Sequence, residues 1–309
     1  MVKSMVSGVA GLRAHQAKMD VIGNNISNVN TYGFKSSRAA FRDALYVTSS
    51  GASDPTEVYG GGNPMQTGYG STLGSIDVMH VRGAFMPTDY PTDCMINGQG
   101  FFLVGPDLGP LPVFGVNSLN LTRVGSFVFD GSGNFVDMNR NLVYGFIATA
   151  VEEDILDPID GVTVIGTKTV YTYNKDEVEP LRMPLDEHGE LMILKQISIG
   201  ADGTIIGIDD NNNVVQVGKI AVANVPNPSA LEASSNSYYT AKANTGDILA
   251  SIPGENTTGA IQAGGLEMSN VDLAKEFTDM ITTQRGYQAN TRIITVTDEM
   301  LAELVNMKR

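Results

Sequence analysis

Apolar residues recur with helical spacing at both ends of the chain, whereas the middle follows a different pattern. Near the start, positions separated by three and four residues are Val2, Met5, Val9, Leu12, Gln16, Met19, Gly23 and Ile26. Near the end, the same steps run through Leu266, Asn270, Leu273, Phe277, Met280, Gln284, Tyr287, Thr291, Ile294, Asp298, Leu301 and Val305. Such spacing aligns side chains on one face of a helix, and a sustained heptad indicates a coiled-coil seam. We therefore predict terminal helices over 1–30 and 267–309 that pair as a coiled coil.

The large apolar residues of these two stripes form the predicted assembly seam, which we define as Met5, Val9, Leu12, Met19, Ile22, Ile26, Val29, Leu273, Phe277, Met280, Tyr287, Ile294, Leu301 and Val305. Ser269 is the expected cap of the second helix, with Asp272 three residues on as in a capping box. From there to the last residue, a helix would extend about 60 Å. A helix of that length must pack along an extended partner.

Glycines interrupt both predicted helices at Gly8, Gly11, Gly23 and Gly286. Each costs on the order of 1 kcal/mol relative to alanine, and helices gain most of their stability from packing. We expect both ends to become ordered when many copies bury the seams together. An intramolecular antiparallel helix pair is the alternative that the same spacing allows.

Four asparagines lie within seven positions at the end of the first helix, at Asn24, Asn25, Asn28 and Asn30. Amides can form hydrogen bonds without bringing charge into a crowded interface, where a charged collar would repel its own copies. Asparagine also favours turns, and Gly33 follows, so the same residues could simply end the helix. The two interpretations can hold at different residues.

Short segments rich in β-branched residues and separated by turn residues fill the middle, and no βαβ alternation is visible. The predicted fold is therefore mixed, with a mainly β, antiparallel middle between long terminal α-helices. We expect an irregular connector over 31–70, with a short helix near 38–46, a β-rich domain over 71–145 plus 190–266, and a small acidic inserted lobe over 146–189. Hairpins are predicted around Asp130–Gly133 and around Asp202 and Gly203.

Charge is sparse, since Asp, Glu, Lys and Arg make up 17% of the chain, and the net charge is −14. This balance argues against nucleic-acid binding, which needs clustered lysine and arginine. Ten acidic and three basic residues lie between Glu152 and Glu187, so half of the excess falls in the predicted lobe. A run of that kind is usually a solvated face.

No segment approaches 18 consecutive apolar residues, so we predict no membrane insertion. The first twenty residues begin like a signal peptide, but Ser7, Gly8, Gly11 and Arg13 interrupt the apolar stretch, and we expect no cleavable signal. The single cysteine, Cys94, excludes an intrachain disulfide. Its apolar surroundings predict a buried, inert thiol.

Nothing in the sequence indicates catalysis, and we expect no enzyme activity, no metal and no cofactor. The stretch from Asp209 resembles a calcium loop at first, but Val214 and Ile220 occupy the positions that need glycine and an acid, so we predict a polar turn. The glycine turn at 97–100 lacks a following helix and is no phosphate cradle. His15, His80 and His188 have no metal-ligand spacing.

The two ends carry long motifs that resemble those of a known family. "SGVAGLRAHQAKMDVIGNNISNVNTYGFKSSRAAFRD" is similar to the start of bacterial flagellar rod and hook proteins, and "LEMSNVDLAKEFTDMITTQRGYQANTRIITVTDEMLAELVNMKR" is similar to their end. "INGQGFF" followed by "LTRVGSFVFDGSGNFV" resembles the shared β-domain core. Within the family, "SNVDLAKEF" and "QRGYQANTRIIT" resemble hook proteins more than distal rod proteins.

The resemblance implies a structural subunit that forms a helical homopolymer, with paired terminal helices lining the inner tube. It implies export without a cleavable signal through the flagellar type III apparatus and an extracellular position in the hook or basal body. The implied partners are other copies, the distal rod protein, the hook–filament junction protein and the hook cap. A hook subunit would act as a universal joint, whereas a rod subunit would be rigid.

A hypothesis from another class is an extracellular enzyme or carbohydrate-binding module anchored by its helical ends. It would require a convergent acid pair or a metal site within 71–265. The sequence contains no motif of that kind, which makes this the remote alternative.

Overall fold

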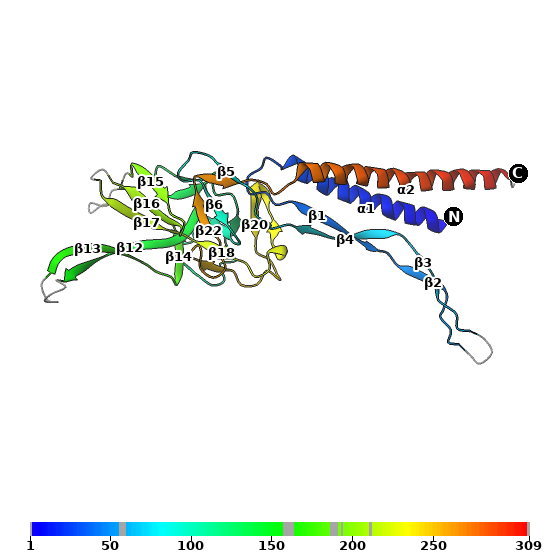
Figure 1. Cartoon of the computed structure of the whole chain (residues 1–309), viewed down its shortest axis with the longest axis horizontal. Helices are drawn as coiled ribbons and strands as arrows, with labels where there is room; N and C mark the ends of the chain where they lie inside the picture. The colour runs from blue at the N-terminus through cyan, green and yellow to red at the C-terminus, as the bar shows by residue number, and fades with distance from the viewer. Residues whose placement is uncertain are drawn as a thin grey trace. The chain divides into compact units, whose positions relative to one another are not determined.

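The computed structural model describes residues 2–55, 60–156, 164–185, 191–192, 194–209 and 212–307, with 150–156 and 164–170 described by their backbone alone. The chain forms two compact units. The helical unit comprises Met1–Val29, Lys35–Met79 and Val271–Arg309, and the β unit comprises Asn30–Phe34 and His80–Asn270. A mainly β middle between two terminal helices is the predicted fold class (Figure 1).

The helical unit contains α1 (Val2–Ser27), α2 (Leu273–Met307) and two antiparallel strand pairs. In one pair, β1 (Ser37–Asp43) joins β4 (Ser71–Val78). In the other, β2 (Tyr46–Ser50) joins β3 (Met65–Gly68). Helix α1 contacts α2, β1 and β4. The two ends of the chain therefore fold together with the segment Lys35–Met79.

The prediction of an irregular connector over 31–70 is wrong for β1, β2 and β3, and the short helix expected near 38–46 is absent from the described residues. The local sequence resembles a helix, but its backbone groups pair with β4, and this tertiary context overrides local preference. The predicted boundary at 71 is also wrong, because β4 belongs to the helical unit and the β unit resumes at His80.

The β unit is built on one antiparallel sheet. Along its main path the order is β15 (Gln196–Ile199), β16 (Thr204–Ile208), β17 (Val214–Ile220), β12 (Leu142–Leu156), β7 (Phe101–Gly105), β9 (Asn120–Thr122), β20 (Tyr238–Thr240) and β19 (Glu232–Ala233). Strands that branch from it are β8 (Leu111–Pro112), β10 (Phe127–Phe129), β11 (Phe135–Asp137), β13 (Val164–Tyr173), β14 (Glu177–Pro180), β18 (Val222–Asn224) and β21 (Leu249–Ser251).

Two separate strand pairs complete the β unit. They are β5 (Phe85–Pro87) with β23 (Gly265–Glu267), and β6 (Cys94–Asn97) with β22 (Ala260–Ala263). Short 3-10 turns lie at Pro228–Ala230 and Ser235–Ser237. Both predicted hairpins are confirmed, since β10 pairs with β11 around Asp130, and β15 pairs with β16 around Asp202.

Strand β7 is buried on both faces, which explains its continuous apolar sequence. Successive side chains of a strand point to opposite faces. Phe101 and Leu103 accordingly enter one core cluster with Tyr144, whereas Phe102 and Val104 enter a second cluster. The second cluster also contains Cys94, whose pKa is raised by burial. The prediction of a buried, inert thiol is confirmed.

The acidic insertion is continuous with the central sheet. Strand β12 runs from the core out to Leu156, and β13 returns along it as an antiparallel partner. Strand β14 pairs with β12, and Val178 and Leu181 are fully buried in the core. The prediction that a separate lobe extends to residue 189 is therefore wrong for β14 and Leu181, which belong to the sheet and core of the β unit. Positions 157–163 and 186–189 of the predicted lobe, with His188, lie outside the described residues.

The polar turn predicted at Asp209 is confirmed where it is described. The Asn212 N–H donates to the Asp209 carbonyl, and the Asp209 N–H donates to Asn213. The turn joins β16 to β17, so its polar residues lie in the connection of a β-hairpin.

Gly125 gives a test of this packing. A methyl group on Gly125 would lie 1.8 Å from the carbonyl oxygen of Cys94, a backbone atom that cannot move aside cheaply. We expect Gly125→Ala to lower the free energy of unfolding by about 3 kcal/mol or more, at the upper end of overpacking effects. Gly131→Ala is the matched control, because nothing lies within 4 Å of its added methyl. Denaturant unfolding of both variants is the measurement, and equal stabilities would contradict the packing described.

Candidate functional site: the paired helices and their exposed faces

Helices α1 and α2 run antiparallel and approach each other through glycine. Gly8 lies against Ile294, and a methyl group on Gly11 would lie 2.7 Å from the Asn290 amide nitrogen. Further along the pair, a methyl group on Gly286 would lie 2.7 Å from the His15 ring. These glycines therefore allow the two helices to approach closely within one chain. Gly23 differs, since nothing lies within 4 Å of its added methyl.

The buried side chains of α2 are polar. Thr283 and Thr297 are both 2% exposed. Each hydroxyl donates to a backbone carbonyl one turn earlier, Thr283 to Asp279 and Thr297 to Ile293. These bonds satisfy the hydroxyls inside the helix and leave their methyl groups for packing. The contact between the helices therefore buries few of the large apolar side chains of α2.

Asn25 connects three elements of the helical unit. Its amide nitrogen donates to the Ser37 carbonyl at 2.9 Å and to Glu276 Oε1 at 3.1 Å, and its amide oxygen accepts the Ser37 N–H at 2.9 Å. Asn25 is 1% exposed. It therefore pairs with the first residue of β1 as a neighbouring strand would, while it also binds α2. Burial raises the pKa of Glu276, and the hydrogen bond from Asn25 opposes that shift.

The other asparagines end the helix. Helix α1 stops at Ser27, and the Asn28 side chain donates back to the Asn24 carbonyl and side-chain oxygen. Turns follow, and Gly33 has φ of +67°. Asn28 therefore ends the helix as one interpretation predicted, and Asn25 is a buried, uncharged link within the chain. An amide collar between copies stays a prediction.

His15 lies in the helix pair beside Gly286 and edge-on to Phe41 of β1, with ring centroids 5.8 Å apart. Its Nδ1 is buried and forms no hydrogen bond. Burial lowers the pKa of His15, and the charge of Lys18 lowers it further. The neutral ring is therefore the form that suits this contact.

Helix α2 begins at Leu273, and its cap is Asp272. The Asp272 carboxylate accepts the Ala274 N–H at 3.0 Å and the Lys275 N–H at 3.3 Å. The predicted cap Ser269 lies outside the helix, so Asp272, the second predicted cap residue, is the cap. An aspartate at this position also complements the positive end of the helix dipole.

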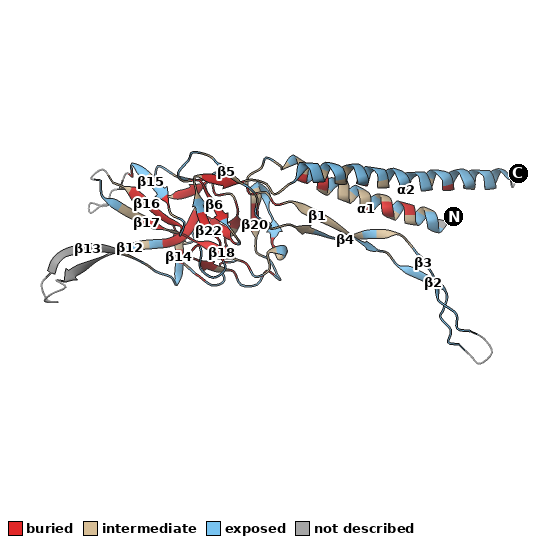
Figure 2. Cartoon of the chain, in the orientation of Figure 1, coloured by how far each residue is buried: buried red, intermediate tan, exposed pale blue. Residues whose placement is uncertain are grey.

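Large apolar side chains remain exposed on α2 in two stripes. The first stripe, in the first half of the helix, consists of Leu273, Phe277 and Ile281. The second stripe consists of Ile293, Val296, Met300, Leu304 and Met307, in steps of three and four. At 100° per residue these stripes face different directions, and Figure 2 shows α2 as mostly exposed over its length. Apart from Leu273 and Phe277, these residues are absent from the predicted seam.

The predicted seam residues divide between inside and outside. On α2, Met280, Ile294 and Leu301 are partly buried, whereas Leu273, Phe277, Tyr287 and Val305 are exposed. On α1, Ile22 is buried, Met5, Leu12, Met19 and Ile26 are partly buried, and Val9 is exposed. Val29, in the turn after α1, is partly buried. The predicted seam therefore contains both residues that pack within the chain and residues that remain exposed. The 3-4-4-3 spacing from Ile293 to Met307 was the signal that would have located the second stripe.

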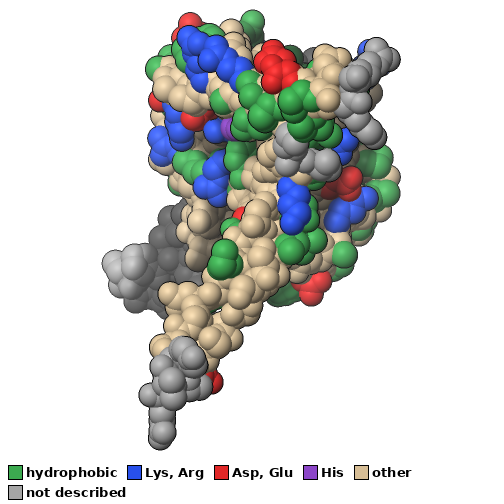
Figure 3. Space-filling model, turned by 90° about the vertical axis from the view of Figure 1, so that its right-hand side faces the viewer, with side chains coloured by type: hydrophobic (Ala, Val, Ile, Leu, Met, Phe, Trp, Pro, Cys, Tyr) green, Lys and Arg blue, Asp and Glu red, His purple; other side chains and the backbone are tan. Residues whose placement is uncertain are grey.

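Charge divides between the two units. The helical unit contains 11 basic and 11 acidic residues, whereas the β unit contains 9 basic and 23 acidic residues. The whole net charge of −14 therefore belongs to the β unit. Seen from the end where both termini lie, hydrophobic side chains reach the surface among lysine and arginine side chains (Figure 3).

Catalytic or metal chemistry has no support in the part of the chain that the structure describes. Over those residues, no group of three or more His, Cys, Asp and Glu side chains could hold a metal ion. His80 packs edge-on against Phe101 and Tyr239. Of the helices described, none has the length and apolar content required to cross a membrane.

Long paired helices with uncovered apolar stripes are typical of a protein that assembles with other chains. Two family models match at the ends: the flagella basal body rod protein over residues 5–35, and the flagellar basal body rod FlgEFG protein C-terminal over residues 262–307. The chain is 36% identical to flagellar basal-body rod protein FlgG of Bacillus subtilis (strain 168), over all of both chains. It belongs to the family of flagellar rod and hook structural proteins.

Hook and rod relatives are similar to this chain at comparable levels. In Borreliella burgdorferi (strain ATCC 35210), flagellar hook protein FlgE is 28% identical over 454 aligned positions, and flagellar basal-body rod protein FlgG is 30% identical over 312. Both alignments cover all of both chains. The family is therefore shown at the level of an axial structural subunit of the flagellum.

Gly11 and Gly23 form a matched pair for testing the helix contact. Alanine improves helix propensity at either site by about 0.5–1 kcal/mol. At Gly11, the added methyl would meet Asn290, whereas at Gly23 it meets nothing. We expect Gly23→Ala to raise, and Gly11→Ala to lower, the thermal stability of the helical unit, measured by circular dichroism at 222 nm. An increase in both variants would contradict the contact.

His15 predicts a pH dependence of the same unit. Because its folded-state pKa lies below the ordinary value of 6.5, the unfolded state takes up the proton first. Its stabilisation is therefore fully present above pH 6.5 and is lost as pH falls below that value. We expect the melting temperature to fall more between pH 7.5 and pH 5 in the unmodified chain than in His15→Gln. Identical pH profiles would exclude His15 as the source.

Proposed function

We propose that this chain is the subunit of the bacterial flagellar hook, a flexible tube that passes rotation from the motor to the filament. Copies would stack into a helical homopolymer, with the paired helices of each subunit forming the inner wall as a coiled coil. The observation that carries the proposal is the pair of uncovered apolar stripes on α2. Burying one large apolar side chain contributes roughly 1.5–3 kcal/mol, so eight such residues in every subunit give a strong drive to assemble.

The division of charge supports this arrangement. A neutral helical unit can pack closely against identical copies, whereas repeated units of like charge repel one another. The acidic β units would form the solvated outer part of the tube, where neighbouring contacts can slide. Screening their charge with salt should favour assembly. In this proposal the partners are other copies, the distal rod protein, the hook–filament junction protein, the hook cap and the type III export apparatus.

A rod subunit is the second candidate function. It is favoured by the 36% identity to the Bacillus subtilis rod protein over all of both chains. The hook proposal relies on the motifs "SNVDLAKEF" and "QRGYQANTRIIT", which surround the Asp272 cap and the middle of α2.

Electron microscopy of basal bodies from a strain that lacks the chain separates the two candidates. Under the hook proposal, the rod remains and the hook is missing. If the rod ends early, the rod assignment replaces it. Complementation with the unmodified chain, which should restore the missing part, is the control.

Phe277 tests the assembly surface itself. It is 50% exposed and lies in the first stripe, so Phe277→Asp should not disturb the β unit. We expect this variant to lose polymerisation at high protein and salt concentration, measured by sedimentation and electron microscopy, because a carboxylate would have to enter an apolar contact. The near-ultraviolet circular dichroism of the β unit should be unchanged.

A control substitution of the same charge is available outside the stripes. Thr278→Asp places the same charge on the next residue of α2. Thr278 is exposed, and its hydroxyl donates to the Ala274 carbonyl of the same helix. It should retain more assembly than Phe277→Asp. Normal polymerisation of Phe277→Asp would exclude the first stripe from the assembly surface.

A further inference from the structure

Every segment through which the chain passes between the two units meets at one place in the β unit. These segments are residues 30–34, the stretch that begins at His80, and the stretch that ends at Asn270. Glu267 touches all three. Its carbonyl accepts the Gly33 N–H at 2.8 Å, its carboxylate Oε1 accepts the Gly83 N–H at 2.7 Å, and it directly precedes the segment that leads to α2.

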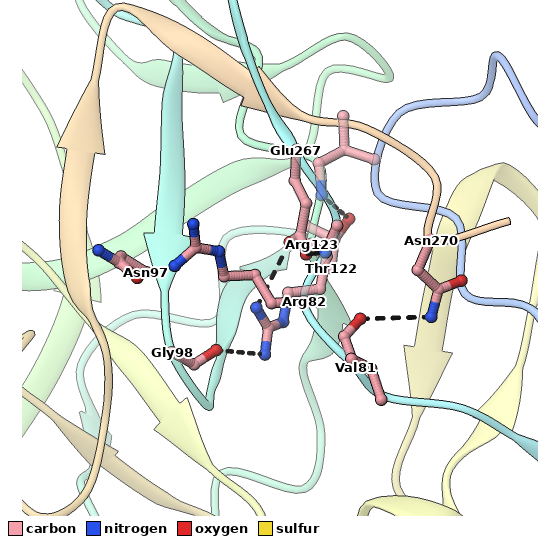
Figure 4. Close-up of polar contacts among 10 residues, drawn as sticks. Val81, Arg82, Asn97, Gly98, Thr122, Arg123, Glu267 and Asn270 are labelled. Carbon is pink, nitrogen blue, oxygen red and sulfur yellow. Dashed lines mark hydrogen bonds and ion pairs between the residues drawn. The ribbon is translucent and has the colours of Figure 1, made fainter. Parts of the chain in front are cut away.

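Glu267 forms a buried ion pair with Arg123 (Figure 4). Arg123 Nη1 lies 3.4 Å from Glu267 Oε2, and the two side chains are 3% and 0% exposed. Arg123 Nη2 also donates to the Gly98 carbonyl at 3.0 Å, and its guanidinium lies 5.2 Å from the centre of the Phe101 ring. The pair is thus attached to the core of the β unit. Burial lowers the pKa of Arg123, and the carboxylate of Glu267 opposes the shift.

Backbone contacts around the pair are too close for side chains. A methyl group on Gly83 would lie 1.9 Å from the Met268 carbonyl, and one on Gly33 would lie 2.9 Å from the backbone nitrogen of Val124. The Met268 N–H donates to the Ala84 carbonyl, and the Asn270 amide donates to the Val81 carbonyl. The three segments are therefore held side by side.

We infer that Arg123 and Glu267 form a clasp that fixes the three connecting segments at one point of the β unit. No covalent bond joins the three segments to one another where they meet, so only non-covalent contacts hold them together there. The clasp makes them one attachment, so a force carried by any one segment is shared among all three. This holds for a hook or a rod subunit alike and does not depend on which of the two the chain is.

Hydrogen exchange on the full-length monomer tests the clasp. The variant is Glu267→Gln, which keeps the shape and the acceptor oxygen but removes the charge that Arg123 needs. A buried charge that loses its partner is strongly disfavoured. We expect the amides of Gly33, Gly83 and Met268 to exchange at least tenfold faster. The Leu103 and Phe146 amides of the central sheet should keep their rates.

Asp107→Asn is the matched control, since it breaks an exposed ion pair with Arg182 in the same unit and should leave all three amides protected. Gly83→Ala is the second variant. It pushes the segments apart at Met268 without changing charge, so it should accelerate the same amides, and it is measured whether or not Glu267→Gln yields folded protein. Unchanged exchange at the three amides in the folded variants would overturn the inference. An equal rise over the whole β unit would also overturn it, because the pair would then be an ordinary part of the core.

Discussion

The close contact of α1 with α2 is the constraint on which the rest of the helical unit depends. Helices can approach each other closely at glycine, and this contact places Gly8 against Ile294, Gly11 against Asn290 and Gly286 against His15. That choice excludes most of the large apolar residues of α2 from the intrachain contact. They remain on the surface, in amounts that a solitary soluble chain would rarely expose. The narrow helix pair and the drive to assemble are therefore two consequences of one arrangement.

Electrostatics acts in the same direction. A neutral helical unit can be repeated at short spacing without accumulating charge, while the β unit carries the whole excess of −14. Inside the helical unit, several buried polar side chains have their partners within the same chain: Thr283 and Thr297 bond within α2, and Asn25 bonds to Ser37 and Glu276. No new polar partner is then required of a neighbour at those positions. The exposed stripes can be covered by apolar contact alone, which tolerates small sliding better than directional hydrogen bonds.

The sequence was a good guide where local physics decides the structure. The helical spacing at both ends, the turns at Asp130 and Asp202, and the buried Cys94 all follow from patterns within a few residues. It was a poor guide where distant partners decide. The strand β1 and the placement of β14 in the central sheet depend on pairing with β4 and β12, which no local pattern reveals. The assembly seam stays a prediction for a related reason: periodicity identifies an apolar stripe, but it cannot divide that stripe between contacts inside the chain and surface left uncovered.

Glu267 and Arg123 lie in two of the family-like motifs of the sequence, but their pairing becomes visible only in the fold. A subunit built of two units joined by several segments would transmit force unevenly if each segment were attached at a different depth. Here the last residue of β23 binds the segment at Gly33 and the segment at Gly83, and a buried arginine neutralises it. A hydrophobic pair of similar volume could fill the same space, but it could not accept the Gly83 N–H. The carboxylate accepts the backbone N–H of Gly83 with one oxygen and pairs with the Arg123 guanidinium through the other. In the proposed clasp, these two contacts together hold the connecting segments against the sheet.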